Sequence, residues 1–148
     1  MKNDIEYILT SLIKKTSNTG EAFRKAAKQI SNTSLKSYFK LKAQERNNFE
    51  QELETELQAL NENLNKNQTD SSRDTKQPTW VNFDAIALYS QEELILEEVI
   101  NGERAALDEY TRLIRKAQLP LRTKSILNSQ KNKIQRGLST IKTFEELY

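Results

Sequence analysis

The stretch NGERAALDEY, residues 101–110, is typical of a helix in which one carboxylate falls on the apolar side. At about 100° per residue, Glu103 lies in the same stripe as Val99, Ala106 and Tyr110. A charge on the buried face of a helix is costly unless it is paired or bound. Glu103 is therefore a candidate metal ligand, a candidate catalytic group or one half of an ion pair, and the rest of the chain decides between these readings.

The apolar residues around this stretch follow a helical period through most of the chain. They recur at three- and four-residue steps in four long segments, which predicts helices over about 3–30, 34–64, 91–117 and 122–146. The sequence SNTS at 31–34 interrupts the first stripe and offers capping side chains to the second helix. Short loops of this kind join antiparallel helices, so we expect two helical hairpins.

The connection between the hairpins is long and has two parts. A polar linker covers about 65–80, and an apolar crossover segment follows at about 80–89, where a short helix remains an open alternative. The prediction is an all-α chain that forms a single domain over residues 1–148. Its expected architecture is a four-helix bundle made of two helical hairpins joined by a long crossover linker.

The composition supports helices and narrows the available chemistry. Hydrophobic residues make up 36% of the 148 residues and charged residues 30%, with only 3 Gly and 2 Pro, which favours long helices over a turn-rich β architecture. The chain has no Cys and no His, which removes thiolate chemistry, the commonest general base and the commonest metal ligand. No apolar run approaches the ~20 residues of a membrane span, and charges interrupt the N-terminus before a signal-peptide core develops. We expect a cytoplasmic protein without a membrane span.

Other polar residues share the apolar stripes of their helices. Arg46 aligns with Phe49 and Leu53, and Gln130 lies near the middle of the fourth helix. Arg can meet a buried carboxylate with two charge-assisted hydrogen bonds. We therefore predict a structural polar layer in which Arg46 pairs with Glu103, while Gln130 and Tyr110 satisfy the remaining donors and acceptors.

The sharper alternative is a carboxylate-bridged pair of metal ions. Four-helix bundles build such centres from a Glu on each of two helices and a Glu-x-x-His on each of the others. Here the corresponding positions read Gly20, Arg46 with Phe49, Glu103, and Gln130 with Lys133, which supply one carboxylate and two cations. The sequence predicts no catalytic residue, no cofactor and no metal site.

The positive charges are distributed unevenly, although the net charge is only +2. No acidic residue lies between Tyr110 and Phe144. Acidic residues are dense in the second helix, where Glu56 ends a run of four glutamates at every second position. Both sets read either as solvated faces that complement each other or as docking surfaces. The basic surface would consist of Arg112, Arg115, Lys116, Arg122, Lys124, Lys131, Lys133 and Arg136.

Two segments carry a resemblance to a known family. KAQERNNFEQEL (42–53) and INGERAALDEY (100–110), supported by GEAFRKAA (20–27) and the Leu-Pro turn at 119–120, resemble a bacterial family of uncharacterised ferritin-like four-helix-bundle proteins. The resemblance runs from about residue 8 to 147. It implies a ferritin-like bundle with a long crossover between the second and third helices, and it implies no known activity. Members of that family often carry a His after the linker, whereas WVNFDAIALY (80–89) has none.

Three functional hypotheses follow from these observations. The leading one is a non-catalytic helical bundle that acts through its surface as a protein-interaction or stress-related accessory module, with an unknown protein or a second copy as partner. The alternative is a degenerate ferritin-like protein that binds metal or oxidises iron. The third is weak, salt-dependent binding of nucleic acid or another anionic surface; the aromatic platforms for single strands are missing, so no specific nucleic acid is expected.

Overall fold

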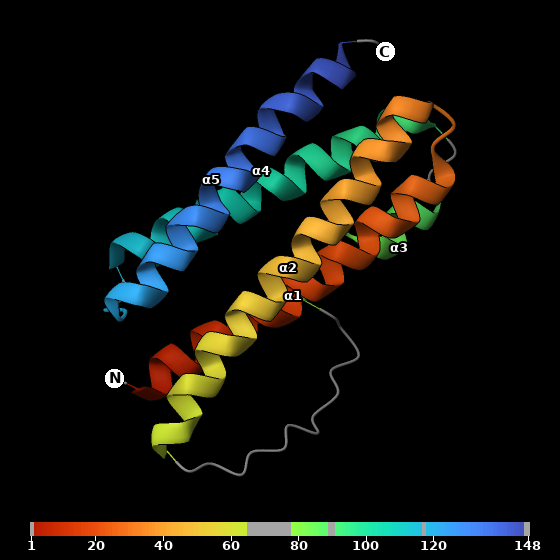
Figure 1. The fold of residues 1–148 in the computed structure, drawn as a ribbon. Coiled ribbons are helices and arrows are strands. Elements are labelled where there is room, and N and C mark those ends of the chain that lie inside the picture. Colours follow the sequence, from red (N-terminus) through yellow and green to blue (C-terminus); the bar gives the residue numbers. More distant parts are fainter. Residues whose placement is uncertain (1, 65–77, 89–90, 117, 147–148) are drawn as a thin grey trace.

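Helices account for nearly all of the described chain. The computed structural model describes residues 2–64, 78–88, 91–116 and 118–146, and within these ranges there is no strand. The helix bounds are α1 Lys2–Gln29, α2 Thr33–Leu64, α3 Phe83–Leu88, α4 Glu92–Lys116 and α5 Leu121–Glu145 (Figure 1). The four long helices begin and end within about one residue of the ranges expected from the apolar pattern. The predicted linker lies outside the described residues up to position 77.

A side-chain cap marks the start of α2. The Asn32 side chain accepts a hydrogen bond from the backbone N–H of Leu35 at 2.9 Å, which satisfies one of the unpaired donors at the start of α2. The backbone N–H and the hydroxyl of Ser31 both donate to the Glu92 carboxylate, at 2.7 and 2.6 Å. The turn between α1 and α2 is thereby bonded to the first residue of α4.

The helices form two antiparallel pairs, α1 with α2 and α4 with α5 (Figure 1). Contacts between the pairs show their relative direction: Ser31 near the end of α1 meets Glu92 at the start of α4, and Lys15 in mid-α1 meets Glu109 late in α4. α1 and α4 are therefore antiparallel, and α2 and α4 run in the same direction. Accordingly, the end of α2 and the start of α4 lie at opposite ends of the molecule (Figure 1).

The apolar stripes meet between the four long helices. Phe23 and Phe39, whose ring centroids are 5.9 Å apart, lie in the part of the core nearest the α1–α2 turn. Phe49 and Tyr110 lie in the other part of the core. Full burial of each large aliphatic or aromatic side chain contributes about 1.5–3 kcal/mol. Further core residues predicted from the pattern and buried here are Leu12, Leu35, Leu53, Ile95, Val99, Leu127, Ile134 and Ile141.

The crossover segment packs against both α1 and α4. The side-chain amide of Asn18 donates to the carbonyl oxygen of Pro78 at 2.8 Å. The backbone N–H of Trp80 donates to the Thr19 hydroxyl at 3.2 Å. On the α4 side, a Cβ atom at Gly102 would lie 2.4 Å from the carbonyl oxygen of Trp80, closer than real atoms approach. The glycine of the NGERAALDEY stretch therefore lets the segment pass against α4, and α3 follows it.

Candidate functional site

The buried ion pair predicted from the sequence is present. Arg46 is completely buried and Glu103 is 2% exposed. The guanidinium donates through Nη1 to Oε2 of Glu103 at 3.1 Å and through Nη2 to Oε1. Burial lowers the pKa of Arg46, but the charge and hydrogen bonds of Glu103 outweigh it and raise the pKa above its ordinary value. The guanidinium of Arg46 therefore stays charged although it is buried.

Aromatic rings enclose the guanidinium of Arg46. Its central carbon lies 5.4 Å from the ring centroid of Phe23 and 5.6 Å from that of Phe49. Such contacts favour a desolvated cation. At Gly20, a Cβ atom would lie 3.4 Å from Cβ of Arg46, an ordinary contact distance. The arginine is thus held on α2 by two rings and by the carboxylate of α4.

Gln130 and Tyr110 bond to each other, and their remaining hydrogen bonds do not reach the ion pair. The Tyr110 hydroxyl donates to the side-chain oxygen of Gln130 at 2.6 Å. The Gln130 amide donates to the Glu52 carboxylate at 2.9 Å and to the carbonyl oxygen of Phe49 at 3.3 Å. Tyr110 lies two turns, about 10 Å, beyond Glu103 along α4, which explains the separation. The interior thus holds two neighbouring polar units, where we expected one network.

Burial also affects the titration of Tyr110. Burial raises its pKa well above the ordinary value of 10, and the nearby charge of Arg46 acts in the opposite direction. The hydroxyl consequently stays protonated and remains a hydrogen-bond donor over the physiological range. This polar unit, like the ion pair, holds its atoms in fixed donor and acceptor roles.

A second cation, Lys42, is almost buried beside α5. Its ammonium donates to the Glu45 carboxylate at 2.8 Å and lies 5.6 Å from the ring centroid of Tyr38. A Cβ atom at Gly137 would lie 2.6 Å from Nζ of Lys42, so the glycine leaves space for the lysine. The Tyr38 hydroxyl donates to the Gly137 carbonyl oxygen at 2.7 Å, which joins α2 to α5 at this level.

The structure reveals a polar cluster around Trp80 that the sequence did not suggest. The Lys15 ammonium bonds to both oxygens of Glu109, at 2.8 and 2.9 Å, and lies 5.8 Å from the ring centroid of Trp80. The Trp80 indole N–H donates to the same carboxylate at 2.9 Å. These residues come from α1, the crossover segment and α4, so no single helix shows a pattern that brings them together.

Glu56 corrects an expectation about the acidic face of α2. We expected it among the solvated glutamates, but only 7% of it is exposed. Its carboxylate accepts a hydrogen bond from the Thr123 hydroxyl at 2.8 Å and forms an ion pair with Nε of Arg122 at 2.9 Å. The signal was present in the sequence, because Glu56 follows Leu53 by three residues on the same stripe.

The basic residues predicted as one surface occupy different environments. Arg122 is bonded to Glu56, and the Lys133 ammonium lies 6.0 Å from the Phe49 ring centroid. The side chain of Lys116 lies outside the described part of the chain. Exposed members are Arg112, Arg115 and Arg136, and half-buried members are Lys124, Lys131 and Lys133. Arg122 is also exposed, so its ion pair with Glu56 lies at the surface, and the eight cations do not form one uniform basic face.

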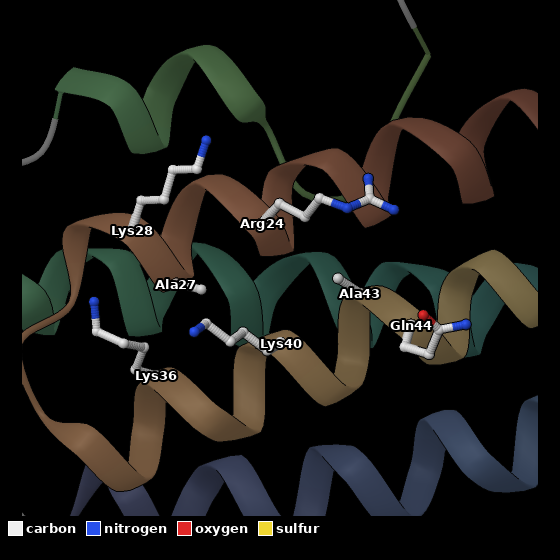
Figure 2. Close-up of a pocket in the computed structure, with 7 residues that line it drawn as sticks. All are labelled: Arg24, Ala27, Lys28, Lys36, Lys40, Ala43 and Gln44. Atoms are coloured by element: carbon white, nitrogen blue, oxygen red, sulfur yellow. The ribbon is translucent and has the colours of Figure 1, made fainter.

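A different basic feature lies on the outer side of the α1–α2 pair. This feature, the α1–α2 groove, has a volume of about 470 Å³ (Figure 2). The sequence pattern had not indicated this groove. The available signal was a four-residue spacing of cations on each helix of the hairpin. The residues that line the groove are Arg24, Ala27, Lys28, Lys36, Lys40, Ala43 and Gln44.

The described residues offer no cluster of metal ligands. Over the ranges with defined placement, no group of three or more His, Cys, Asp or Glu residues could hold a metal ion. A search of the same ranges for a helix long and apolar enough to cross a membrane found none. The polar features of the described residues are ion pairs, buried hydrogen bonds and a basic groove.

Together, these features define an all-helical domain with buried ion pairs. Residues 4–116 match the model of the family described as a domain of unknown function, DUF2383. The chain belongs to this family. The matched region extends from α1 to the end of α4 and stops before α5. Among curated proteins, none matches this chain.

Proposed function

We propose that this chain is a ferritin-like four-helix bundle that is not catalytic and works as a protein-interaction or stress-related accessory module. Support for the architecture comes from helix direction. α2 and α4 run the same way, so the connection between them has to return along the length of the molecule. Ferritin-like folds are four-helix bundles with one such long crossover.

The observation that carries the proposal is the Arg46–Glu103 pair. In ferritin-like metal centres, carboxylates from facing helices project inward and bind the metal ions. Here both oxygens of the inward-facing Glu103 are bonded to a guanidinium that is itself completely buried. A metal ion at this place would meet a fixed positive charge, and binding it would leave Arg46 without its partner. The pair fits a role in setting how the hairpins meet, which leaves the surface as the functional part.

The second candidate, a degenerate ferritin-like metal-binding or iron-oxidising protein, makes a different use of Glu103. Its carboxylate would have to leave Arg46 and act with other oxygen donors such as Glu52, whose carboxylate is bonded to Gln130. Uncovering a buried guanidinium costs several kcal/mol. That cost favours the structural reading.

An iron-oxidation experiment separates the two candidates. Protein purified without chelators is subjected to elemental analysis and is then mixed with ferrous ion in air, alongside a Glu103→Gln variant. We expect no stoichiometric metal and the same slow oxidation in both samples as in buffer. Oxidation by the wild type that the variant lacks would establish the iron-oxidising alternative.

The interaction role needs its own experiment. Affinity purification of the native chain under several salt conditions, followed by mild cross-linking, should return the same stable partner each time. The absence of any stable partner would contradict the interaction module, whatever the outcome with iron.

A further inference from the structure

The α1–α2 groove owes its shape to the size of its side chains. Ala27 and Ala43, each 3% exposed, form the floor where α1 and α2 pack together. Figure 2 shows Lys36 and Lys40 extending from α2 beside these alanines, whereas Lys28 extends from the other edge of α1, toward α3. Its volume of about 470 Å³ lies within the range of about 300–1,000 Å³ that is usual for small-molecule sites.

The charge of the groove is concentrated and largely unpaired. Arg24 bonds to Glu21 at 2.5 Å, but Lys28, Lys36 and Lys40 form no ion pair with any residue that the structure describes. None of the lining residues is acidic. The groove therefore carries three ammonium groups, those of Lys28, Lys36 and Lys40, whose charge no described residue neutralises through an ion pair.

The positions of these lysines are unfavourable for the helices that carry them. Lys36 and Lys40 are four residues apart on α2, where like charges repel across one turn. Lys36 also lies in the first turn of α2, which has no acidic residue, and a cation at this end opposes the helix dipole. Among the residues that line the groove, only Ala27 and Ala43 belong to the buried core. An anion in the groove would relieve the repulsion that the lysines create.

The residue types indicate which anion fits. The planar fork of arginine suits bidentate binding of either carboxylate or phosphate, and the only arginine among the lining residues is already bonded to Glu21. Lysine binds phosphate as a mobile point charge. No lining residue is aromatic, so the groove offers no platform on which a nucleic-acid base could stack. We propose that the α1–α2 groove binds a small soluble anion that carries two or more phosphate groups.

This site goes beyond the proposed interaction role and does not depend on it. Titration calorimetry at low ionic strength, with tripolyphosphate as the probe and orthophosphate for comparison, tests it on the full chain. We expect one saturable site for tripolyphosphate and binding of orthophosphate at least tenfold weaker, because several ammonium groups act on one ligand. Raising the salt concentration should weaken the binding, since the groove is open to solvent.

Matched variants show whether the groove itself is the site. Lys28→Gln, Lys36→Gln and Lys40→Gln together should weaken tripolyphosphate binding at least tenfold. The same three positions changed to Arg should keep it within about threefold. The control removes an equal charge from α5, with Lys124→Gln, Lys131→Gln and Lys142→Gln, and should weaken binding less than twofold. Far-ultraviolet circular dichroism verifies that each variant is folded.

Three results would overturn the proposal. The first is the absence of saturable tripolyphosphate binding to the wild type. The second is an equal loss in the groove variant and the α5 control, which would reduce the effect to net charge. The third is tighter binding of a single-stranded oligonucleotide than of tripolyphosphate, with the same dependence on the groove lysines, which would assign the surface to a macromolecular polyanion.

Discussion

Replacing Glu103 with glutamine keeps the shape of the side chain but removes the negative charge that faces Arg46. Arg46 is completely buried, and both of its bonds to Glu103 are charge-assisted. Glutamine accepts one of these bonds and turns its own amide donors toward the other guanidinium nitrogen. Leaving a buried charge without its partner costs about 3–5 kcal/mol, so we expect Glu103→Gln to lower the free energy of unfolding by about 3 kcal/mol.

A double-mutant cycle makes this prediction quantitative. As single changes, Arg46→Met and Glu103→Leu should each also cost about 3 kcal/mol, because each leaves the charge of the other residue buried without its partner. Arg46→Met combined with Glu103→Leu removes both charges and fills much of the same volume, so the double variant should lose less stability than either residue changed alone. A domain is typically stable by about 5–15 kcal/mol, so these differences are measurable.

The assay is urea unfolding at neutral pH, followed by circular dichroism and by the fluorescence of Trp80, the only tryptophan. Trp80 contacts α1 and α4 rather than the ion pair, so it reports unfolding of the whole domain. Simple additivity, with the double variant about 6 kcal/mol less stable than the wild type, would refute the pairing of Arg46 with Glu103.

Three other substitutions have expected outcomes of different sign. Gly102→Ala should destabilise the protein by about 2 kcal/mol, because its Cβ would lie 2.4 Å from the Trp80 carbonyl oxygen and the backbone must move. Gly20→Ala should stabilise the protein by up to about 1 kcal/mol through helix propensity, since its Cβ makes an ordinary 3.4 Å contact with Arg46. Urea unfolding measures the stability of both glycine variants, and equal effects would contradict the different packing around Gly102 and Gly20. Burial, followed by a neighbouring carboxylate, raises the pKa of Glu50 above 4.5, so the native state binds more protons than the unfolded state and loses stability as pH rises past 4.5. Glu50→Gln should therefore stabilise the protein at neutral pH and have no effect below pH 4.5 in thermal unfolding; a gain that persists in acid would contradict this.

The helices could be predicted because the apolar period is strong and local. Arg46 and Glu103 could be paired for the same reason: each is a charge inside an apolar stripe, and buried charges need partners. The same reasoning would have found Glu56, which lies in the stripe of Leu53, but the run of glutamates around it suggested a solvated face. For Glu56, the position in the helical stripe was therefore a better predictor of burial than the charge of the neighbouring residues.

Features that depend on helix rotation and on the crossover could not be predicted in this way. The groove combines Lys28 of α1 with Lys36 of α2, and the sequence does not specify which sides of two antiparallel helices meet. Contacts of Lys15 and Glu109 with Trp80 depend on where the crossover segment lies between α1 and α4. The role of Gly102 as the point of close approach to the crossover segment appears only when that segment is in place.

The central claim is that Glu103 is committed to Arg46 and is not a metal ligand, and nitrogen-edited NMR of the arginine side chains tests it most directly. The claim predicts a resolved Arg46 guanidinium signal with slow proton exchange, because the group is buried and doubly bonded. That signal should stay unchanged when Zn²⁺ is added and should shift or disappear in Glu103→Gln. A shift of the Arg46 signal that saturates at one equivalent of Zn²⁺ would contradict the claim.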